Sequence, residues 1–307
     1  MRKIKWPNNK KFAFTIIDDT DGSTLQNTKP VYDFLISKGI LTTKTVWVFP
    51  SRDDTWTGSS LQNEEYLKYV KFLYKSGFEI AFHNAGSGGF KRDETLFALN
   101  FLKKEFGSYP ILHINHGDNI ENLYWGPNRF SGLIKLLYAQ KKKNVRSEGE
   151  NPKSPYFWGD IAKKNIKYIR NRTFKQLNTL KCDRRLVYKE KGKTDFSNYW
   201  FSSSDGMRLS SFLELINKKS IDKLVKKHGC AIVYTHFSYD FVDENGVLNS
   251  DFKSVIDYLT TKDGWFVPAS TLLDFVLNDK EYKPSLFYQI KQDLKWFFEK
   301  TFKKRNY

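Results

Sequence analysis

The stretch TIIDDTDGST, residues 15–24, joins a short apolar run to a turn that carries three carboxylates. The apolar run has the length and the β-branched content of a buried strand, and it ends at Asp18, Asp19 and Asp21. Carboxylates this close repel one another, so they stay ionised only beside a cation or hydrogen-bond donors. We therefore expect a metal site or shifted carboxyl pKa values here. The alternative is a turn in which Asp19, Asp21 and Ser23 cap the next helix.

Similar apolar runs alternate with stretches of helical periodicity along the chain, which is typical of parallel strands joined by crossover helices. The expected strands cover residues 12–18, 45–49, 78–83, 111–116, 167–172, 199–203, 231–236 and 265–269. The expected helices cover residues 29–38, 63–76, 92–106, 129–139, 209–218, 221–228, 251–261 and 271–277. Gly39 and Gly77 follow the first two helices and are suited to end them. The sequence predicts one α/β domain over residues 1–280, with an exposed loop over 141–156.

The composition is that of a globular protein with a strongly basic balance. Of 307 residues, 40% are hydrophobic and 17% are aromatic, which is enough to bury a core. The formal net charge of +17 would attract nucleic acid, an anionic membrane or an acidic glycan. The basic residues are scattered and no nucleic-acid-binding module accompanies them, so nucleic acid is not the expected partner. The two cysteines lack a CxxC spacing, so neither a zinc ribbon nor a disulfide framework is indicated.

Residues 281–307 are expected to form a separate element, a basic amphipathic C-terminal helix. Its apolar side chains recur near helical spacing, opposite several lysines: Phe287, Ile290, Leu294, Phe297, Phe298 and Phe302. Such a helix either packs onto the domain or docks on an anionic membrane or another protein. The N-terminus has no apolar signal-peptide core, and no stretch is long enough to span a bilayer. We therefore expect a cytoplasmic protein, with peripheral membrane contact as an option for this helix.

Three of the five histidines come directly after expected strands: His83, His116 and His236. In a parallel barrel the carboxyl ends of the strands converge on one face, which Asp18 and Asp19 would share. A lone histidine at such a place is more often a structural hydrogen-bonding group. Three together, with acids beside them, favour a metal centre or an acid–base site. His113 and His228 are expected to be structural.

These features together resemble the polysaccharide deacetylase family, a group of carbohydrate esterases with a distorted strand–helix barrel. TIIDD, residues 15–19, is similar to the family's TFDDG-like strand end, and GFEIAFH, residues 77–83, matches its GxEIxxH segment. IVYTH, residues 232–236, corresponds to a late strand that ends in histidine. GWFVPASTLLDFV, residues 264–276, resembles the closing strand and helix. The resemblance covers roughly residues 12–276 and implies an α/β fold of the distorted (β/α) barrel type.

The resemblance also implies a metal-dependent hydrolase that removes acetyl groups from N-acetylated sugars of a polysaccharide or its precursor. It implies that Asp18 is the catalytic base and that Asp19 and His83 bind a divalent metal, with Zn²⁺ as the expected ion. His236 would be the general acid that protonates the departing amine. Asp205 would stand in for a later acidic motif of the family. The expected partner is then a carbohydrate substrate.

Two departures from the family pattern bear on the metal site. The family has a second metal-binding histidine four or five residues after the first, and HNAGSGG, residues 83–89, lacks it. Its Arg-Pro motif on the fourth strand is replaced by INHGDNIEN, residues 114–122. From strand-end geometry alone, we expect His116, with Asn115 or Asp118 beside it, to supply the missing metal ligand.

Two other functions fit parts of this pattern. DTDGST, residues 19–24, matches the DxDGxT loop of haloacid-dehalogenase-like phosphatases, in which Asp19 would accept a phosphoryl group and the carboxylates would bind Mg²⁺. Asp118 would then imitate the late acidic motif, but His83 and His236 would have no role. The missing second histidine points instead to a catalytically inactive, glycan-binding pseudo-deacetylase.

Overall fold

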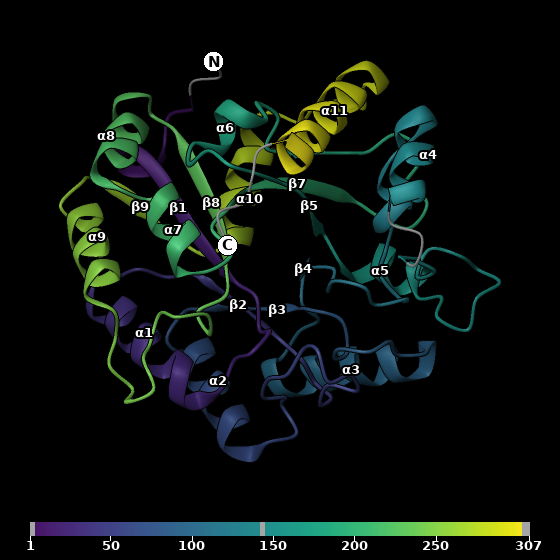
Figure 1. Ribbon diagram of the computed structural model, residues 1–307, viewed down its shortest axis with the longest axis horizontal. Helices are drawn as coiled ribbons and strands as arrows, with labels where there is room; N and C mark the ends of the chain where they lie inside the picture. Colours follow the sequence, from purple (N-terminus) through teal and green to yellow (C-terminus); the bar gives the residue numbers. More distant parts are fainter. Residues whose placement is uncertain (1–3, 142–144, 303–307) are drawn as a thin grey trace.

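The computed structural model describes residues 4–141 and 145–302, which form a barrel of parallel strands wrapped by helices (Figure 1). Seven strands close into a ring in the order β1-β2-β3-β4-β5-β7-β8, and β8 pairs again with β1. Their bounds are Phe12–Asp18 (β1), Thr43–Val46 (β2), Glu79–Phe82 (β3), Leu112–His113 (β4), Tyr168–Phe174 (β5), Tyr199–Asp205 (β7) and Cys230–Thr235 (β8). The expected α/β class and distorted (β/α) barrel are confirmed.

Two further strands lie outside the ring and explain its distortion. β9 (Gly264–Phe266) pairs in parallel with Phe12–Phe14, the first half of β1. The first residues of β2 pair with the carboxyl end of β1, through the pairs Ile17↔Thr43 and Asp18↔Lys44. β6 (Val187–Tyr188) pairs antiparallel with β7. The ring is therefore closed at the carboxyl end of β1, which is where the acidic turn begins.

The helices surround this ring, and several begin and end where the sequence predicts. Their bounds are Leu25–Ser37 (α1), Glu64–Lys75 (α2), Arg92–Phe106 (α3), Gly132–Lys141 (α4), Gly159–Asn165 (α5), Thr179–Cys182 (α6), Leu209–Leu215 (α7), Lys218–Lys226 (α8), Ser250–Thr260 (α9), Ala269–Asp279 (α10) and Leu286–Phe302 (α11). Short 3₁₀ helices cover Pro7–Asn9 and Gly126–Arg129. Gly39 and Gly77 follow α1 and α2 with φ of +66° and +95°, which favours glycine at both helix ends. No described helix is both long and apolar enough to cross a membrane.

The side chains of β1 divide between two cores because successive residues of a strand point to opposite faces. Phe14 and its even-numbered neighbours pack outward, against α1, α7, α8 and α9. Ile17 and Ala13 point inward, into a cluster with side chains of β3, β4, β8 and α10. Asp18 continues the outward row, and Asp19 continues the inward row.

The structure differs from the sequence-based expectations between β4 and β7. The strand expected over residues 111–116 is reduced to Leu112–His113, and α5, α6 and β6 were not predicted. Part of the loop expected to be exposed is packed instead. A Cβ at Gly149 would lie 2.2 Å from the carbonyl oxygen of Glu121, so this glycine allows two loops to meet. Residues 142–144 of the same expected loop lie outside the described residues.

Buried charges fix α11 to the barrel. Arg172 of β5 is fully buried and donates hydrogen bonds to Asp293 of α11 from Nε (2.9 Å) and Nη2 (2.6 Å). The same guanidinium donates to Glu190 at 2.7 Å. Trp296 adds an apolar contact, since it packs in a cluster with Phe130 and other side chains. The described part of the C-terminal helix therefore packs onto the barrel.

Replacing Arg172 should destabilise the protein strongly, because Asp293 and Glu190 would be left as buried charges without their shared partner. We expect Arg172→Met to lower the free energy of unfolding by about 3–5 kcal/mol, measured by urea denaturation. Lys29→Met is the control, since Lys29 pairs with Asp33 on an exposed helix surface and such pairs contribute less than about 1 kcal/mol. Equal stability of the two variants would contradict this account of how α11 is held.

Candidate metal centre

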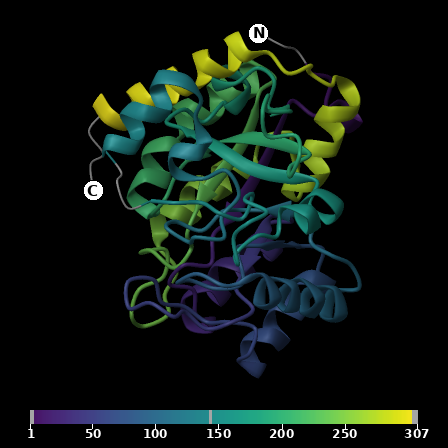
Figure 2. The same ribbon diagram turned by 90° about the vertical axis from the view of Figure 1, so that its right-hand side faces the viewer.

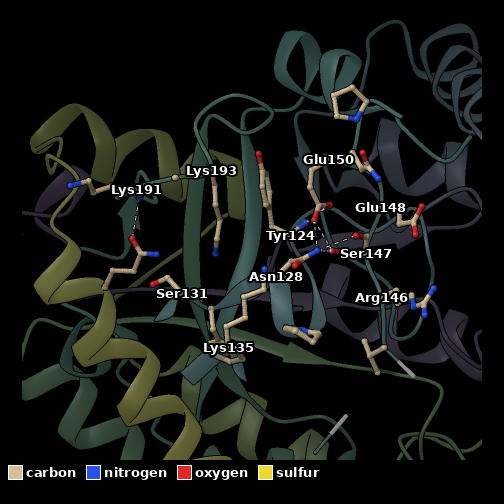
Figure 3. A pocket seen from close by; sticks show the side chains of 17 residues that line it. Tyr124, Asn128, Ser131, Lys135, Arg146, Ser147, Glu148, Glu150, Lys191 and Lys193 are labelled. Carbon is tan, nitrogen blue, oxygen red and sulfur yellow. Dashed lines mark hydrogen bonds between the residues drawn. The ribbon is translucent and has the colours of Figure 1, made fainter. Parts of the chain in front are cut away.

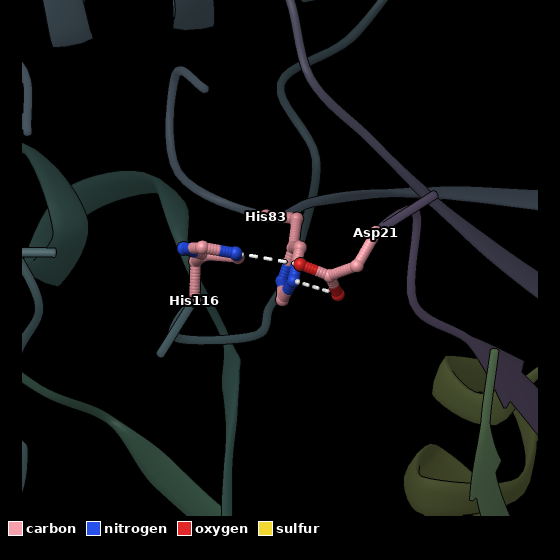
Figure 4. A group of neighbouring side chains, drawn as sticks. All are labelled: Asp21, His83 and His116. Atoms are coloured by element: carbon pink, nitrogen blue, oxygen red, sulfur yellow. Dashed lines mark hydrogen bonds and ion pairs between the residues drawn. The ribbon is translucent and has the colours of Figure 1, made fainter. Parts of the chain in front are cut away.

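Asp21 lies in the turn after β1, and its carboxylate is surrounded by three histidines. Oδ1 is 2.6 Å from Nε2 of His116, and Oδ2 is 2.9 Å from Nε2 of His236 and 3.3 Å from Nε2 of His83. Figure 4 shows His83 and His116 pointing at the same carboxylate from different segments. All four side chains are buried. The structure thus brings together the three histidines that follow predicted strands, around a carboxylate of the acidic turn.

The contact of the second ring nitrogen fixes the tautomer of each histidine. Each Nδ1 faces an oxygen that can only accept a hydrogen bond: the carbonyl of Ile114 for His83 (3.0 Å), the carbonyl of Met207 for His236 (2.9 Å) and Oδ1 of Asn119 for His116 (3.1 Å). Nδ1 therefore carries the hydrogen, and in the neutral ring Nε2 holds a lone pair. Three lone pairs and a carboxylate then point at one another. Only protons on Nε2 or a bound cation can make this arrangement stable.

The pKa shifts in the cluster follow from the same contacts. Burial acts to raise the pKa of Asp21, but the neighbouring His116 and His83 outweigh it and hold this pKa well below its usual range. Burial lowers the pKa of His116, but the Asp21 carboxylate outweighs it and the net pKa is raised. The pKa of His236 is raised in the same way, chiefly by its hydrogen bond to Asp21. Without a metal, the raised pKa values favour protons on the rings of His116 and His236.

The donor set fits a divalent transition metal. One oxygen of Asp21 and one nitrogen each of His83 and His116 lie within 4.8 Å of one another, and Asp19, Asp21 and His236 form an overlapping group of the same size. Two imidazole nitrogens with one carboxylate are ligands that Zn²⁺ and similar ions prefer. The fixed Nδ1–H groups aim the lone pairs inward, as the hydrogen bonds behind metal-binding histidines usually do.

Asp19 lies beside this cluster and is held by an arginine from the opposite side of the barrel. Both of its oxygens accept hydrogen bonds from the guanidinium of Arg170, with Nη1 at 2.9 Å from Oδ1. Arg170 lies in β5, with its guanidinium 4.2 Å from the ring centre of Tyr234. A two-pronged contact of this kind fixes the plane of the carboxylate. Asp19 therefore faces the interior with a set orientation, next to His236.

Asp18 points the other way, into the layer between the barrel and its helices. Its Oδ2 accepts a hydrogen bond from the hydroxyl of Tyr32 (2.9 Å) and pairs with Nζ of Lys44 (2.8 Å). Its Oδ1 accepts from the backbone N–H of Phe237 at 2.8 Å. Asp18 and Lys44 are both fully buried. These contacts tie β1 to α1, to β2 and to the segment after β8, on the face away from the histidines.

The other residues expected near the metal have structural contacts. Asn115 accepts a hydrogen bond from the backbone of Leu123 (2.9 Å), and Asp118 is exposed. Asp205 pairs with Lys300 of α11. Thr24, and not one of the aspartates, caps α1. Asp19 and Asp21 are therefore available to the site.

His113 and His228 lie outside the cluster. His113 is fully buried, with its ring nitrogens hydrogen-bonded to Phe82 and Asn115. Burial is the main cause that lowers the pKa of His113 to about 3, so its ring is neutral at ordinary pH. His228 is exposed after α8.

The segment that lacks the family's second histidine positions His116 indirectly. The backbone N–H of Gly88 donates to Oδ1 of Asn119 (3.1 Å), the same oxygen that receives Nδ1–H of His116. Nδ2 of Asn119 donates in turn to Glu121 at 2.7 Å. Gly88 has φ of +101°, and a Cβ there would lie 2.8 Å from the Cβ of Arg52. Sequence reasoning missed this chain of contacts because it joins loops whose approach no local pattern indicates.

Aromatic rings line the cluster on several sides. Trp47 stacks on His83 with an interplanar angle of 5° and ring centres 6.3 Å apart. Trp56 meets His116 edge-on at 5.9 Å, and Tyr239 lies 4.6 Å from His236. Trp47 is fully buried, whereas Trp56 and Tyr239 are partly exposed. Partly exposed aromatic rings beside a buried polar cluster can hold the apolar face of a ligand.

A cleft of about 790 Å³ lies between the segments near residues 124–131, 145–152 and 191–193 (Figure 3). Its polar groups largely bind one another. Glu150 accepts hydrogen bonds from Asn128 (2.9 Å) and Ser147 (2.8 Å), and burial raises the pKa of this carboxyl. The residues that line it include neither Asp21 nor the three histidines. The histidine cluster is therefore the better candidate for chemistry.

No model of a known protein family matches the sequence, and no curated protein matches it. Solved structures similar to this chain include peptidoglycan deacetylase PdaC from Bacillus subtilis, with 14% identity, a TM-score of 0.44, and coverage of 89% of this chain and 95% of the other. A family 4 acetyl xylan esterase from Clostridium thermocellum, in complex with a cobalt ion, has 11% identity, a TM-score of 0.43, and coverage of 89% and 99%. A mutant CE4 family pseudoenzyme with restored enzymatic activity has 11% identity, a TM-score of 0.40, and coverage of 91% and 71%. Each of these similarities covers most of this chain, at low sequence identity.

Proposed function

We propose that this chain is a metal-dependent deacetylase that acts on N-acetylated sugars of a polysaccharide or its precursor. The observation that carries the proposal is the convergence of three histidine Nε2 atoms on Asp21 beside a fixed Asp19. This convergence supports a site in which metal ligands, a base and an acid reach one bound group. The motifs that resemble the polysaccharide deacetylase family lie at the same strand ends.

In this proposal Asp21, His83 and His116 hold the metal. The assignment keeps the two histidines that the sequence suggests and gives to Asp21 the position expected for Asp19. One oxygen of Asp21 and one ring nitrogen each of His83 and His116 lie within 4.8 Å of one another. Asp19 belongs to a different group of this kind, with Asp21 and His236. When bound, Zn²⁺ or a similar ion supplies Lewis acidity toward a water and the acetyl carbonyl.

Asp19 is the group we assign as base, in place of Asp18. Its carboxylate faces the interior, and Arg170 fixes its orientation, so it can accept the proton of a water that attacks the acetyl carbon. Asp18 lies on the opposite, outer face of β1, where it contacts Tyr32, Lys44 and Phe237. Removing a proton from a water in the interior would require Asp18 to leave these buried contacts.

His236 is the group we assign as general acid. Its Nδ1–H is held by the carbonyl of Met207, and its Nε2 points into the cluster. Asp21 helps to raise the pKa of His236, which favours the protonated ring that an acid requires. The proton would go from Nε2 to the departing nitrogen as the C–N bond breaks. The products are acetate and the free amine of the sugar.

The surroundings favour a sugar over a phosphate ester. Trp56 and Tyr239 offer partly exposed rings beside His116 and His236, on which a sugar ring can pack. A phosphatase of the haloacid-dehalogenase type would need Asp19 as a nucleophile and an oxygen-rich Mg²⁺ site. The cluster is instead rich in nitrogen, because three imidazole rings surround Asp21.

The first test concerns the metal itself. We expect purified wild-type protein to bind about one divalent ion per chain, and His83→Ala and Asp21→Asn to lose it, because about three protein ligands are needed for a catalytic site. Elemental analysis after dialysis measures the ion. The exposed His228→Ala is the matched control and should keep it. Full metal content in His83→Ala would rule out the ligand set.

Metal affinity should also depend on pH in a defined direction. The pKa of the ligand His116 is raised in the metal-free cluster by the Asp21 carboxylate, so its proton competes with the ion. Affinity should therefore fall as the pH is lowered from about 8 to about 6, and binding should release protons. Competition with a chelating dye gives the affinity, and calorimetry in two buffers gives the protons. Affinity that does not change across this range would contradict the arrangement.

The acid and base are tested with N-acetylglucosamine oligomers as substrate and acetate release as the signal. Asp19→Asn and His236→Ala should each lower kcat by about 10²–10⁴-fold, because proton transfer is lost. Asp19→Asn should also keep its metal. Asp18→Asn should instead lower the thermal stability, since the buried partner of Lys44 is changed. If folded, metal-loaded Asp18→Asn were inactive and Asp19→Asn fully active, Asp18 would be the base, as the motif alone suggests.

A further inference from the structure

α11 packs on the barrel with its polar side and turns its apolar side outward. The buried side chains of this helix are mostly polar: Gln289, Gln292, Asp293, Trp296 and Glu299. Phe287 is 80% exposed, and Leu294, seven residues later on the same stripe, is 40% exposed. Ile290 is 36% exposed on the same side. A helix that only packs on a core buries its apolar side chains and exposes its polar ones, and α11 has the reverse distribution.

α4 continues this apolar surface. Leu133 and Leu136 are 69% and 63% exposed, and Leu137 is 47% exposed. The two helices meet through the rings of Tyr138 and Trp296, 6.2 Å apart, and Figure 2 shows them side by side on the outside of the molecule. Of the fourteen exposed large hydrophobic side chains among the described residues, eight lie on α4 and α11. Such a concentration marks an interaction surface.

The charges on this surface are basic. α4 contains no acidic residue, and the two acids of α11, Asp293 and Glu299, are buried against the barrel. Lys135 and Lys291 are exposed between the apolar side chains. In the sequence, both helices are followed directly by further lysines, which lie outside the described residues.

A basic groove of about 1390 Å³ runs along the other edge of α11. Its lining includes Phe287 and one acidic residue, Glu214. Ten lining residues are basic: Lys175, Lys181, Arg184, Arg185, Lys223, Lys226, Lys227, Lys283, Lys291 and Lys295. The outward apolar stripe of α11 is therefore bordered by an excess of basic side chains, of which Arg185 is buried and paired with Asp183.

We propose that α4 and α11 form a docking surface for an anionic lipid bilayer. Phe287, Leu294 and the leucines of α4 enter the headgroup region, and the bordering lysines and arginines contact anionic headgroups. A second copy of this chain would bring the same positive charge to the contact, and an anionic polymer alone would not use the apolar stripe. Of these three partners, only the bilayer matches both features, and it does so whatever reaction the barrel catalyses.

Sedimentation with vesicles tests the proposal on the full chain. The wild type should bind vesicles of phosphatidylglycerol and phosphatidylcholine, but not pure phosphatidylcholine, and high salt should weaken binding. Phe287→Ser with Leu294→Ser should lower the partition coefficient by about tenfold or more, because two apolar side chains no longer leave water. Leu133→Ser with Leu136→Ser on α4 is an independent second variant. Phe72→Ser with Phe97→Ser, at side chains 49% and 55% exposed on α2 and α3, is the control and should bind as the wild type does.

Circular dichroism and thermal melting show which variants are folded, and light scattering gives the oligomeric state. Binding that both folded apolar variants retain would overturn the proposal, because positive charge alone would explain it. Absence of wild-type binding would overturn it as well. Dimers that dissociate in the Phe287→Ser, Leu294→Ser variant, without vesicle binding, would assign the surface to a second copy instead. Acetate release from soluble oligomers should be the same in all these variants, so failure here leaves the proposed reaction untouched.

Discussion

The Asp21 carboxylate joins parts of the barrel that the chain connects only over long distances. Its three histidine partners follow β3, the short β4 and β8, and each is aimed by a hydrogen bond from the ring nitrogen that faces away from the carboxylate. Because acceptors face one another at the centre, the arrangement requires positive charge. The electrostatics of the site, the choice of tautomer and the fit to a metal all follow from this one constraint.

Much of the candidate site can be predicted from the sequence, because polar residues that end apolar runs of a parallel sheet meet at one edge. His83, His116 and His236 were found in this way. The choice among the aspartates was not, because β1 is buried on both faces and FAFTIID shows no polar–apolar alternation. The structure shows that odd-numbered residues face the interior, which sets Asp19 inward and Asp18 outward. Asp21 lies in the turn after the strand, where side chains no longer alternate between two faces.

Contacts between distant segments account for most of what was missed. Arg170 meets Asp19 across 151 positions of sequence, and no local pattern links them. The C-terminal helix has the predicted periodicity, but the pattern gave no indication of which face would pack. A buried cluster around Arg172 reverses the usual arrangement, since ion pairs hold the polar face to the barrel. The fold was therefore easier to predict than the surface it presents.

The strands of the barrel are unevenly paired, and the histidine cluster connects the strands that pair least. β1 pairs with β8 over six residue pairs, but with β2 over only two, and β3 meets β4 at a single pair. The contacts of Asp21 with His83 and His116 connect the segments that follow β1, β3 and β4, across these two weakly paired positions. The cluster therefore links strands that share few backbone hydrogen bonds. Any motion that separates these strands would also separate Asp21 from His83 and His116.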